Sequence, residues 1–315
     1  MNGTYPVRMA GAHDHGGGGH GHGIGAHAGA RHRWRLAVAL GVIGTFFVVE
    51  LVAGLVADSL ALLSDAGHMA ADVLALGAAL AATRIATRPD STGRRTFGSY
   101  RAEVFAAGLT VLLMVSVAVF ILNEARLRIG EDVEVASGPM LAVGALGLVA
   151  NLVALFLLRG GAGESINVKG AYLEVLADTL GSVGVIAAGL LVMWTGNPVW
   201  DTVVALAIAA FVVVRAVLLG REVVQVLGQH APAGIVPAEV EAALAEVPGV
   251  SEVHDLHVWC LTSGMNVATA HLVAAPGETD AVLSAAAQVL RERFQMEHAT
   301  LQVESTSHEC HTTDW

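Results

Sequence analysis

The sequence predicts an α-helical integral membrane protein in which six transmembrane helices are followed by a small C-terminal α+β domain. The first observation is composition: 54% of the 315 residues are hydrophobic and only 14% are charged, against about 25% charged residues in soluble domains. The second is a mean hydropathy of +0.62. The third is a change of character after Gly228, where long apolar stretches give way to short alternating ones.

Each transmembrane helix is predicted from an apolar stretch long enough to cross about 30 Å of hydrocarbon as a helix. The abundant Gly and Ala residues suit close helix packing in lipid better than a soluble core. The six stretches are residues 35–57, 60–83, 103–124, 138–158, 169–194 and 199–220.

The distribution of arginine predicts the orientation of these helices. Basic residues gather before the first stretch, between the second and third, and at the end of the sixth, where Arg215 and Arg221 lie. The opposite loops are mostly acidic, with Arg126 and Arg128 as a local exception. By the positive-inside rule, both termini face the cytoplasm and the chain is a multi-pass protein of the cytoplasmic membrane.

The two ends of the chain differ from the helical part, which we assign to residues 34–222. Residues 1–33 are rich in His and Gly, cannot bury a core and are predicted to be a disordered cytosolic tail. Its imidazoles could capture metal transiently, or the segment could be merely a solvated tail. Residues 308–315 form a short tail with His and Cys.

Residues 229–307 are predicted to form a cytosolic domain with the order αββαβ. A proline and early glutamates start a helix over 237–247, and TDAVLSAAAQVLRERF gives a second helix. SEVHDLHVWCL and NVATAHLVA alternate as strands around a hairpin turn, and HATLQVES gives a third strand. This order predicts a ferredoxin-like layer with both helices on one face of a small sheet.

Two pairs of polar residues interrupt apolar helices. His68 and Asp72 lie four residues apart in the second stretch, and Glu174 and Asp178 have the same spacing in the fifth. This spacing puts each pair on one helix face. Acids inside a membrane segment are energetically costly and usually handle ions or protons. We therefore predict one shared metal site.

These segments resemble the cation diffusion facilitators, and more narrowly the bacterial cobalt, zinc and cadmium resistance exporters. The resemblance is carried by ELVAGLVADSLALLSDAGHMAADV, FGSYRAEVFAA, NVKGAYLEVLADTLGSVGVI and, in the C-terminal domain, VHDLHVWCLTSG followed by AHL. It implies a homodimeric metal/proton antiporter in which His68, Asp72, Glu174 and Asp178 form a tetrahedral transport site. It also implies metal binding in the C-terminal domain.

The sequence departs from the common zinc-type pattern of that family, because Glu174 stands where a second His is usual. A carboxylate makes the site harder and favours oxygen-loving ions. One imidazole and three carboxylates still suit Zn²⁺. Zn²⁺ is therefore the expected cargo, with Co²⁺ or Cd²⁺ also open and an exporter of Mn²⁺ or Fe²⁺ as the alternative.

Proton exchange follows from the ligand chemistry. Metal binding needs deprotonated ligands, so capture of the ion releases protons. Crowded carboxylates repel one another, which favours proton uptake once the cation leaves. We expect cytoplasmic metal to occupy the site, the bundle to open outward, and incoming protons to displace the ion.

Possible regulatory metal ligands lie in the C-terminal domain and tail. The strands that carry His257 and His271 are neighbours in the predicted hairpin, so these two residues are favoured. Packing of histidines around Trp259 is the alternative. The candidate ligands are His254, Asp255, His257, His271, His308 and Cys310. Glu50 and Asn151, also within apolar stretches, are predicted to form hydrogen bonds between helices.

Other functional classes fit less well. A net charge of −11 argues against a nucleic-acid partner. An intramembrane metalloenzyme needs an open coordination position, and the sequence has no His-Glu-x-x-His motif. A metal-sensing receptor would not require acids within the membrane spans. The expected partners are metal ions, protons, the lipid bilayer and a second copy of the chain.

Overall fold

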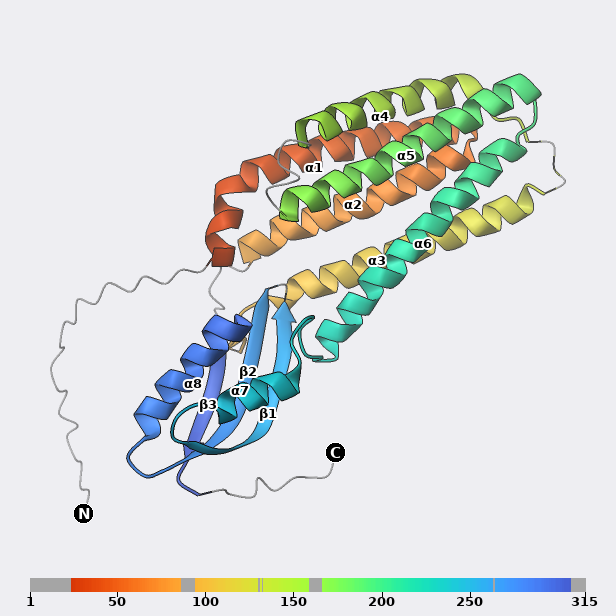
Figure 1. The fold of residues 1–315 in the computed structure, drawn as a ribbon. Helices are drawn as coiled ribbons and strands as arrows, with labels where there is room; N and C mark the ends of the chain where they lie inside the picture. Colours follow the sequence, from red (N-terminus) through yellow and green to blue (C-terminus); the bar gives the residue numbers. More distant parts are fainter. Residues whose placement is uncertain are drawn as a thin grey trace, which may run out of the picture.

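Six long helices form one bundle, with a small α+β domain at one end (Figure 1). The computed structural model describes residues 24–85, 94–129, 131, 133–158, 166–262 and 264–306. All six predicted helices are present among them. They are α1 (Ile24–Ala57), α2 (Leu60–Ile85), α3 (Arg101–Leu127), α4 (Ser137–Leu158), α5 (Ile166–Thr195) and α6 (Val199–Leu227).

Helix α1 begins earlier than the sequence predicts. The disordered tail was expected to reach residue 33, but α1 starts at Ile24. Ala and Arg, which make up half of residues 24–33, have high helix propensity and favour a helix that extends beyond its apolar part. The rest of the predicted tail, residues 1–23, lies outside the described residues.

The bundle consists of closely packed pairs. Helix α1 packs on α2, α4 on α5, and α3 on α6. The α3–α6 pair diverges from the other four helices toward the C-terminal domain (Figure 1). We call the end of the bundle beside this domain the near end, and the opposite end, where α1 connects to α2 and α5 to α6, the far end.

Among the described residues, length and apolar composition qualify five helices, α1 and α3 to α6, to cross a membrane. Helix α2 has 26 residues but carries Asp65, His68 and Asp72 within its apolar sequence. Its first half is largely buried against the other helices. Helix α2 is thus shielded where its acids lie.

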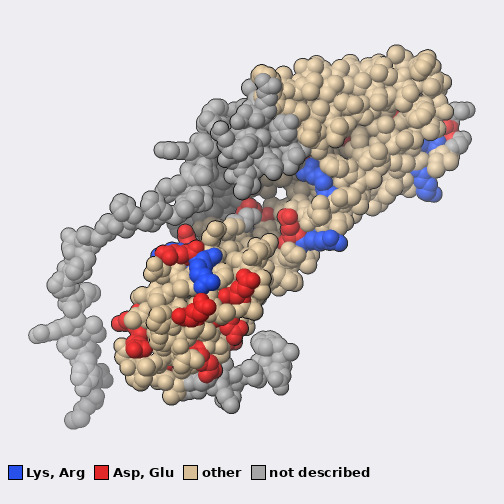
Figure 2. Space-filling view, viewed as in Figure 1, with Lys and Arg blue, Asp and Glu red and all other residues tan. Residues whose placement is uncertain are grey.

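The outer surface of the helices is apolar. Large side chains such as Val56, Leu180 and Trp194 are exposed. On the face shown in Figure 2, the described acidic and basic side chains gather on the C-terminal domain and at the ends of the bundle. A wide apolar surface between charged ends is expected of a protein embedded in lipid.

At the far end, α6 is fastened to the start of α2. Asp201, in the first turn of α6, is fully buried. Its carboxylate accepts hydrogen bonds from Ser59 Oγ at 2.6 Å and from the backbone N–H groups of Leu60 at 2.6 Å and Ala61 at 3.1 Å. It therefore caps the N-terminus of α2, where free N–H groups and the helix dipole favour a negative charge.

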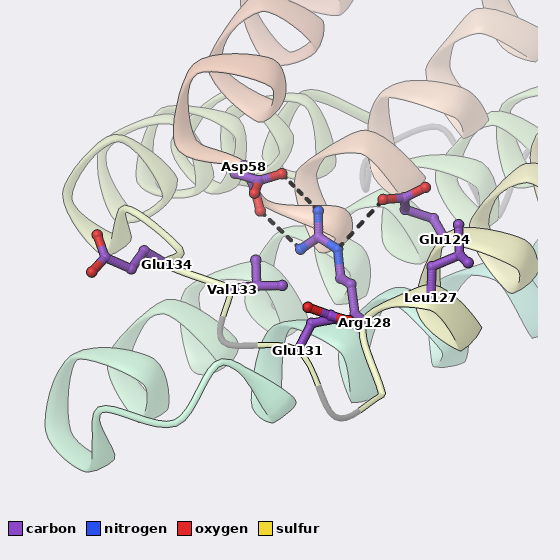
Figure 3. A pocket seen from close by; sticks show the side chains of 7 residues that line it. All are labelled: Asp58, Glu124, Leu127, Arg128, Glu131, Val133 and Glu134. Atoms are coloured by element: carbon purple, nitrogen blue, oxygen red, sulfur yellow. Dashed lines mark hydrogen bonds and ion pairs between the residues drawn. The ribbon is translucent and has the colours of Figure 1, made fainter.

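Arg128, just after α3, forms ion pairs at the same end of the bundle. Its guanidinium lies 2.8 Å from Oδ1 of Asp58 and 3.6 Å from Oδ2 of Asp201. Figure 3 shows the side chain pointing between Asp58 and Glu124, beside a pocket that Glu131 and Glu134 also line. One cation therefore links α3, α6 and the turn between α1 and α2.

The C-terminal domain has the predicted αββαβ order. Its elements are α7 (Pro237–Ala245), β1 (Val250–Thr262), β2 (Met265–Ala274), α8 (Thr279–Phe294) and β3 (His298–Glu304). The sheet order is β1-β2-β3, with β1 and β2 antiparallel and β2 and β3 parallel. Val240 of α7 and Leu290 of α8 pack on Ala270 and Leu272 of β2 in one core.

A bulge interrupts the pairing of β1 with β2. The register places His254 opposite His271 and His257 opposite Thr269, with an irregularity between the two pairs. Asp255 lies in this bulge with φ of 53°, a left-handed conformation that Asp tolerates better than most residues.

The C-terminal domain contacts the near end of α3. Thr262 Oγ1, at the end of β1, donates a hydrogen bond to Glu103 Oε2 at 2.8 Å. The rings of Phe97 and His298 meet edge to face at 5.5 Å. The sheet therefore touches a transmembrane helix directly.

Candidate functional site

Three of the four predicted transport ligands meet between α2 and α5. His68 Nε2 lies 3.1 Å from Asp178 Oδ1 and 3.8 Å from Asp72 Oδ2. One ligand atom from each residue lies within 4.8 Å of the others. His68 and Asp72 lie one turn apart on α2, as their spacing predicts. The face of α2 that carries them is the face that packs toward α5.

The fourth predicted ligand, Glu174, lies one turn before Asp178 on α5. Its side chain lies outside the described part of the structure. Its membership of the site remains a prediction from the spacing and the family resemblance.

The three side chains of the site differ in how much of each is exposed to solvent. The side chain of His68 is 4% exposed, that of Asp72 is 19% and that of Asp178 is 30%. Phe211 of α6 meets the His68 ring edge to face at 6.1 Å. The imidazole is therefore fixed in a packed interior, whereas the carboxylates border more open space.

Sequence reasoning missed one member of this neighbourhood. Arg215 of α6 was interpreted only as a basic residue that closes the sixth span. Its Nη1 lies 3.0 Å from His68 Nε2, and its Nη2 lies 3.9 Å from Asp72 Oδ1. Long arginine side chains can reach far from their own backbone, so charge counting along the sequence could not place this contact.

A second pair of acids lies beside the site. Glu50 of α1 and Asp65 of α2 are buried, and their carboxyl groups are hydrogen-bonded to each other. Two carboxyl groups can share a hydrogen bond only when one carries a proton. Glu50 thus bonds between helices as predicted, with a partner that the sequence did not reveal.

Asn151 also bonds between helices as predicted. Its Nδ2 donates to Ser182 Oγ at 3.3 Å, which joins α4 to α5. Neither Glu50 nor Asn151 belongs to the metal-binding groups found among the described residues.

The C-terminal domain holds a second group that could bind a metal. It consists of His254, His271 and Glu304, on β1, β2 and β3. Nδ1 of His271 lies 3.0 Å from Oε1 of Glu304. Both ring nitrogens of His254 are buried and have no hydrogen-bond partner among the described residues. Each lies near a carboxylate instead, Nδ1 at 3.7 Å from Glu252 Oε1 and Nε2 at 3.8 Å from Glu304 Oε2. Buried imidazole nitrogens beside carboxylates fit a metal ligand set.

Of the other predicted C-terminal ligands, Asp255 borders this group, with its Oδ2 3.9 Å from Nε2 of His271. His257 Nε2 is 3.0 Å from Asp255 Oδ1, and the His257 side chain is 65% exposed. The bulge at Asp255 makes His254, rather than His257, the neighbour of His271. His308 and Cys310 lie outside the described residues. The sequence analysis did not name Glu304. A single acidic residue at the end of a strand carries no sequence signal that separates a metal ligand from an ordinary surface acid.

Comparison with protein families assigns both parts of the chain. Residues 36–227 match the cation efflux transmembrane domain, and residues 232–306 match the cytoplasmic domain of cation efflux proteins. The chain belongs to the cation efflux family. It is therefore a multi-pass membrane transporter and not an enzyme.

Named relatives of this cation efflux protein are similar over most of their length. The metal cation efflux system protein CzcD of Cupriavidus metallidurans is 43% identical over 271 residues, which cover 85% of each chain. The zinc transporter ZitB of Escherichia coli is 38% identical over 283 residues, 89% of each chain. A cadmium, cobalt and zinc/H(+)-K(+) antiporter of Bacillus velezensis is 32% identical over 279 residues, covering 87% of this chain and 88% of the relative.

Proposed function

We propose that this cation efflux protein exports a divalent metal ion, Zn²⁺ foremost and Co²⁺ or Cd²⁺ as well, in exchange for protons. The metal would be bound by His68, Asp72, Glu174 and Asp178. The observation that carries the proposal is the convergence of one imidazole and two carboxylates within 4.8 Å inside the helical bundle. Zn²⁺ accepts both nitrogen and carboxylate oxygen, and the relatives' names include zinc, cobalt and cadmium.

Exchange for protons is supported by the same ligands. Each ligand binds either the metal or a proton, so metal affinity rises with pH and protons compete with the ion. The Bacillus relative is named as an antiporter that uses H(+).

An exporter tuned to Mn²⁺ or Fe²⁺ is the second candidate. Glu174 replaces the His of the common zinc-type pattern, and three carboxylates favour harder cations. The alternative predicts that Mn²⁺ or Fe²⁺ is carried faster than Zn²⁺ under the same gradient.

The group of His254, His271 and Glu304 is proposed as a resident metal site in the C-terminal domain. Its ligands come from three strands of one sheet, so a bound ion would tie the strands together. The sheet contacts α3 through Thr262 and Glu103, which offers a route by which bound metal could regulate transport.

We further propose that the protein works as a homodimer in the cytoplasmic membrane, with both termini in the cytoplasm. The arginine distribution supports this orientation. The match of residues 232–306 to the cytoplasmic domain of cation efflux proteins is consistent with it.

Metal flux in reconstituted vesicles tests the proposal. With the C-terminal domain outside, Zn²⁺ uptake into vesicles with an acidic lumen should exceed uptake without a pH gradient. Asp178→Ala should abolish uptake. Asp280→Ala, in the first turn of α8, is the matched control and should leave uptake unchanged.

Two results would contradict the proposal. If the flux of Zn²⁺, Co²⁺ and Cd²⁺ is the same with and without an imposed pH gradient, proton exchange is excluded. Wild-type rates in folded Asp178→Ala protein would exclude the assigned site. Running Mn²⁺ and Fe²⁺ in the same assay decides between the two cargo classes.

A further inference from the structure

Arg215 brings a permanent positive charge into the candidate transport site. It comes from α6, a helix that supplies none of the proposed ligands. Its guanidinium contacts His68 at 3.0 Å and Asp72 at 3.9 Å, on the side chains that would hold the metal. Its own side chain is 25% exposed, so it is neither sealed in the core nor free in solvent.

The contact with His68 involves the atom that a metal would use. Nε2 lies 3.1 Å from an Asp178 oxygen and 3.0 Å from an Arg215 nitrogen. A ring nitrogen carries either a proton or a lone pair, whereas guanidinium only donates and a carboxylate only accepts. A hydrogen bond from Arg215 uses the Nε2 lone pair, which is also what a metal ion requires, whereas a hydrogen bond to Asp178 uses a proton on Nε2. The two hydrogen bonds are therefore alternatives that depend on the tautomer of His68.

Arg215 also compensates charge that the site carries without metal. Like charges held close together repel one another. Asp72 and Asp178 lie in one group, and Glu174 lies one turn before Asp178 on α5. A guanidinium cannot release its proton under ordinary conditions, so Arg215 supplies positive charge at any pH at which the protein folds.

The backbone that carries Arg215 is held in place. Its neighbours Val212 and Ala216 are buried in a cluster with Ala71 of α2 and Met114 of α3. The long side chain can change rotamer while α6 stays packed. The guanidinium, rather than the helix, is therefore the part that can leave the ligands.

We propose that Arg215 is a built-in competitor of the cargo. It contacts the ligands when no metal is bound and withdraws when a divalent ion enters. By competing for His68 and Asp72 it lowers metal affinity and speeds release of the ion. The inference rests on the proposed function, because it assigns a role within the same transport site.

Metal binding to the purified full-length protein in detergent tests this role. Arg215→Gln removes the charge and keeps a polar, though shorter, side chain. Zn²⁺ affinity, measured against a metal-binding dye, should rise about tenfold or more, since the ion no longer displaces a cation. Arg215→Lys keeps the charge and should stay within about threefold of wild type. Arg221→Gln, on the exposed surface of the same helix, should bind as wild type does.

Vesicle transport supplies the second measurement. Arg215→Gln should show a lower KM for Zn²⁺ together with a lower maximal rate, because release becomes slower. A purely structural role would instead weaken binding in Arg215→Gln and lower its melting temperature. Unchanged or weaker Zn²⁺ binding in that variant overturns the inference and leaves the proposed function standing. A wild-type protein that neither binds nor carries Zn²⁺, Co²⁺ or Cd²⁺ overturns both.

Discussion

Individual side chains set the chemistry of both candidate metal sites. In the bundle, His68 offers one nitrogen among two acids and an arginine. In the C-terminal domain, His254 offers two ring nitrogens that have no hydrogen-bond partner among the described residues. The first environment supports exchange of ions because several groups compete for one atom. The second supports retention of a metal, because a bound ion would satisfy nitrogens that have no hydrogen bond of their own.

The choice of cargo is predicted to depend on Glu174. Glu174→His restores an imidazole at this position and makes the site softer, so Zn²⁺ should gain on Mn²⁺ by about tenfold in relative affinity, or about 1.4 kcal/mol. Competition binding with both ions in purified protein measures the ratio. Glu222→His, on the exposed surface of α6, is the control. An unchanged ratio in Glu174→His would remove this residue from the ligand set.

The two histidines of β1 are predicted to differ in the C-terminal site. His254→Ala should lose about one tightly bound Zn²⁺ per chain, because this residue shares its site with His271 and Glu304. His257→Ala should retain that ion, since His257 contacts Asp255 and is mostly exposed. Metal content after dialysis of the full-length protein gives the count. Equal losses in both variants would contradict the assignment.

At the scale of elements, glycines set how closely the helices approach one another. A Cβ at Gly147 of α4 would meet the Phe46 ring of α1 at 2.9 Å, and one at Gly189 of α5 would meet Leu141 of α4 at 2.9 Å. A Cβ at Gly67 would overlap the Val117 side chain of α3. Since Gly67 directly precedes His68, the same close packing fixes α2 against α3 and orients the ligand.

Gly67→Ala is predicted to destabilise the bundle. The added methyl group must displace Val117, and such overpacking costs about 1–3 kcal/mol. The melting temperature in detergent should fall, and Zn²⁺ binding should weaken because His68 moves. Gly77→Ala, also on α2 but with nothing within 4 Å of the new atom, should leave both quantities nearly unchanged. A neutral Gly67→Ala would show that α2 and α3 pack less closely here.

For the whole molecule, the far and near ends of the bundle are held differently. At the far end, Asp201 caps α2 and meets Arg128 after α3, so three helices are joined through buried charges. At the near end, the α3–α6 pair diverges from the other helices (Figure 1) and the C-terminal sheet touches α3 through Thr262. The far end is therefore held by buried charged contacts, whereas the near end is held by the contact between the sheet and α3.

Asp201→Asn is therefore predicted to loosen the far end. Asp201 is fully buried and accepts three hydrogen bonds, so loss of its charge should cost about 2–4 kcal/mol. Asp58→Asn removes another partner of Arg128, but Asp58 is 59% exposed and the change should cost less than about 1 kcal/mol. Chemical denaturation in detergent measures both. Equal effects would show that burial does not set the strength of this contact.

The sequence by itself determined the parts whose signal is local. Apolar stretches of membrane length predicted α1 to α6, and alternation predicted the strands of the C-terminal domain. Four-residue spacing put His68 and Asp72 on one face of α2, because the helical period is fixed by backbone geometry. The start of α1 was misplaced, since apolar content is a poor guide to where helix propensity ends.

Only the tertiary structure decided which side chains meet across elements. The contacts of Arg215 with His68, of Glu50 with Asp65, and of Glu304 with His271 depend on how helices and strands are rotated and spaced. The bulge at Asp255 changed which histidine faces His271. Such contacts join residues far apart in the chain, and packing of the whole interior fixes them, so no local pattern encodes them.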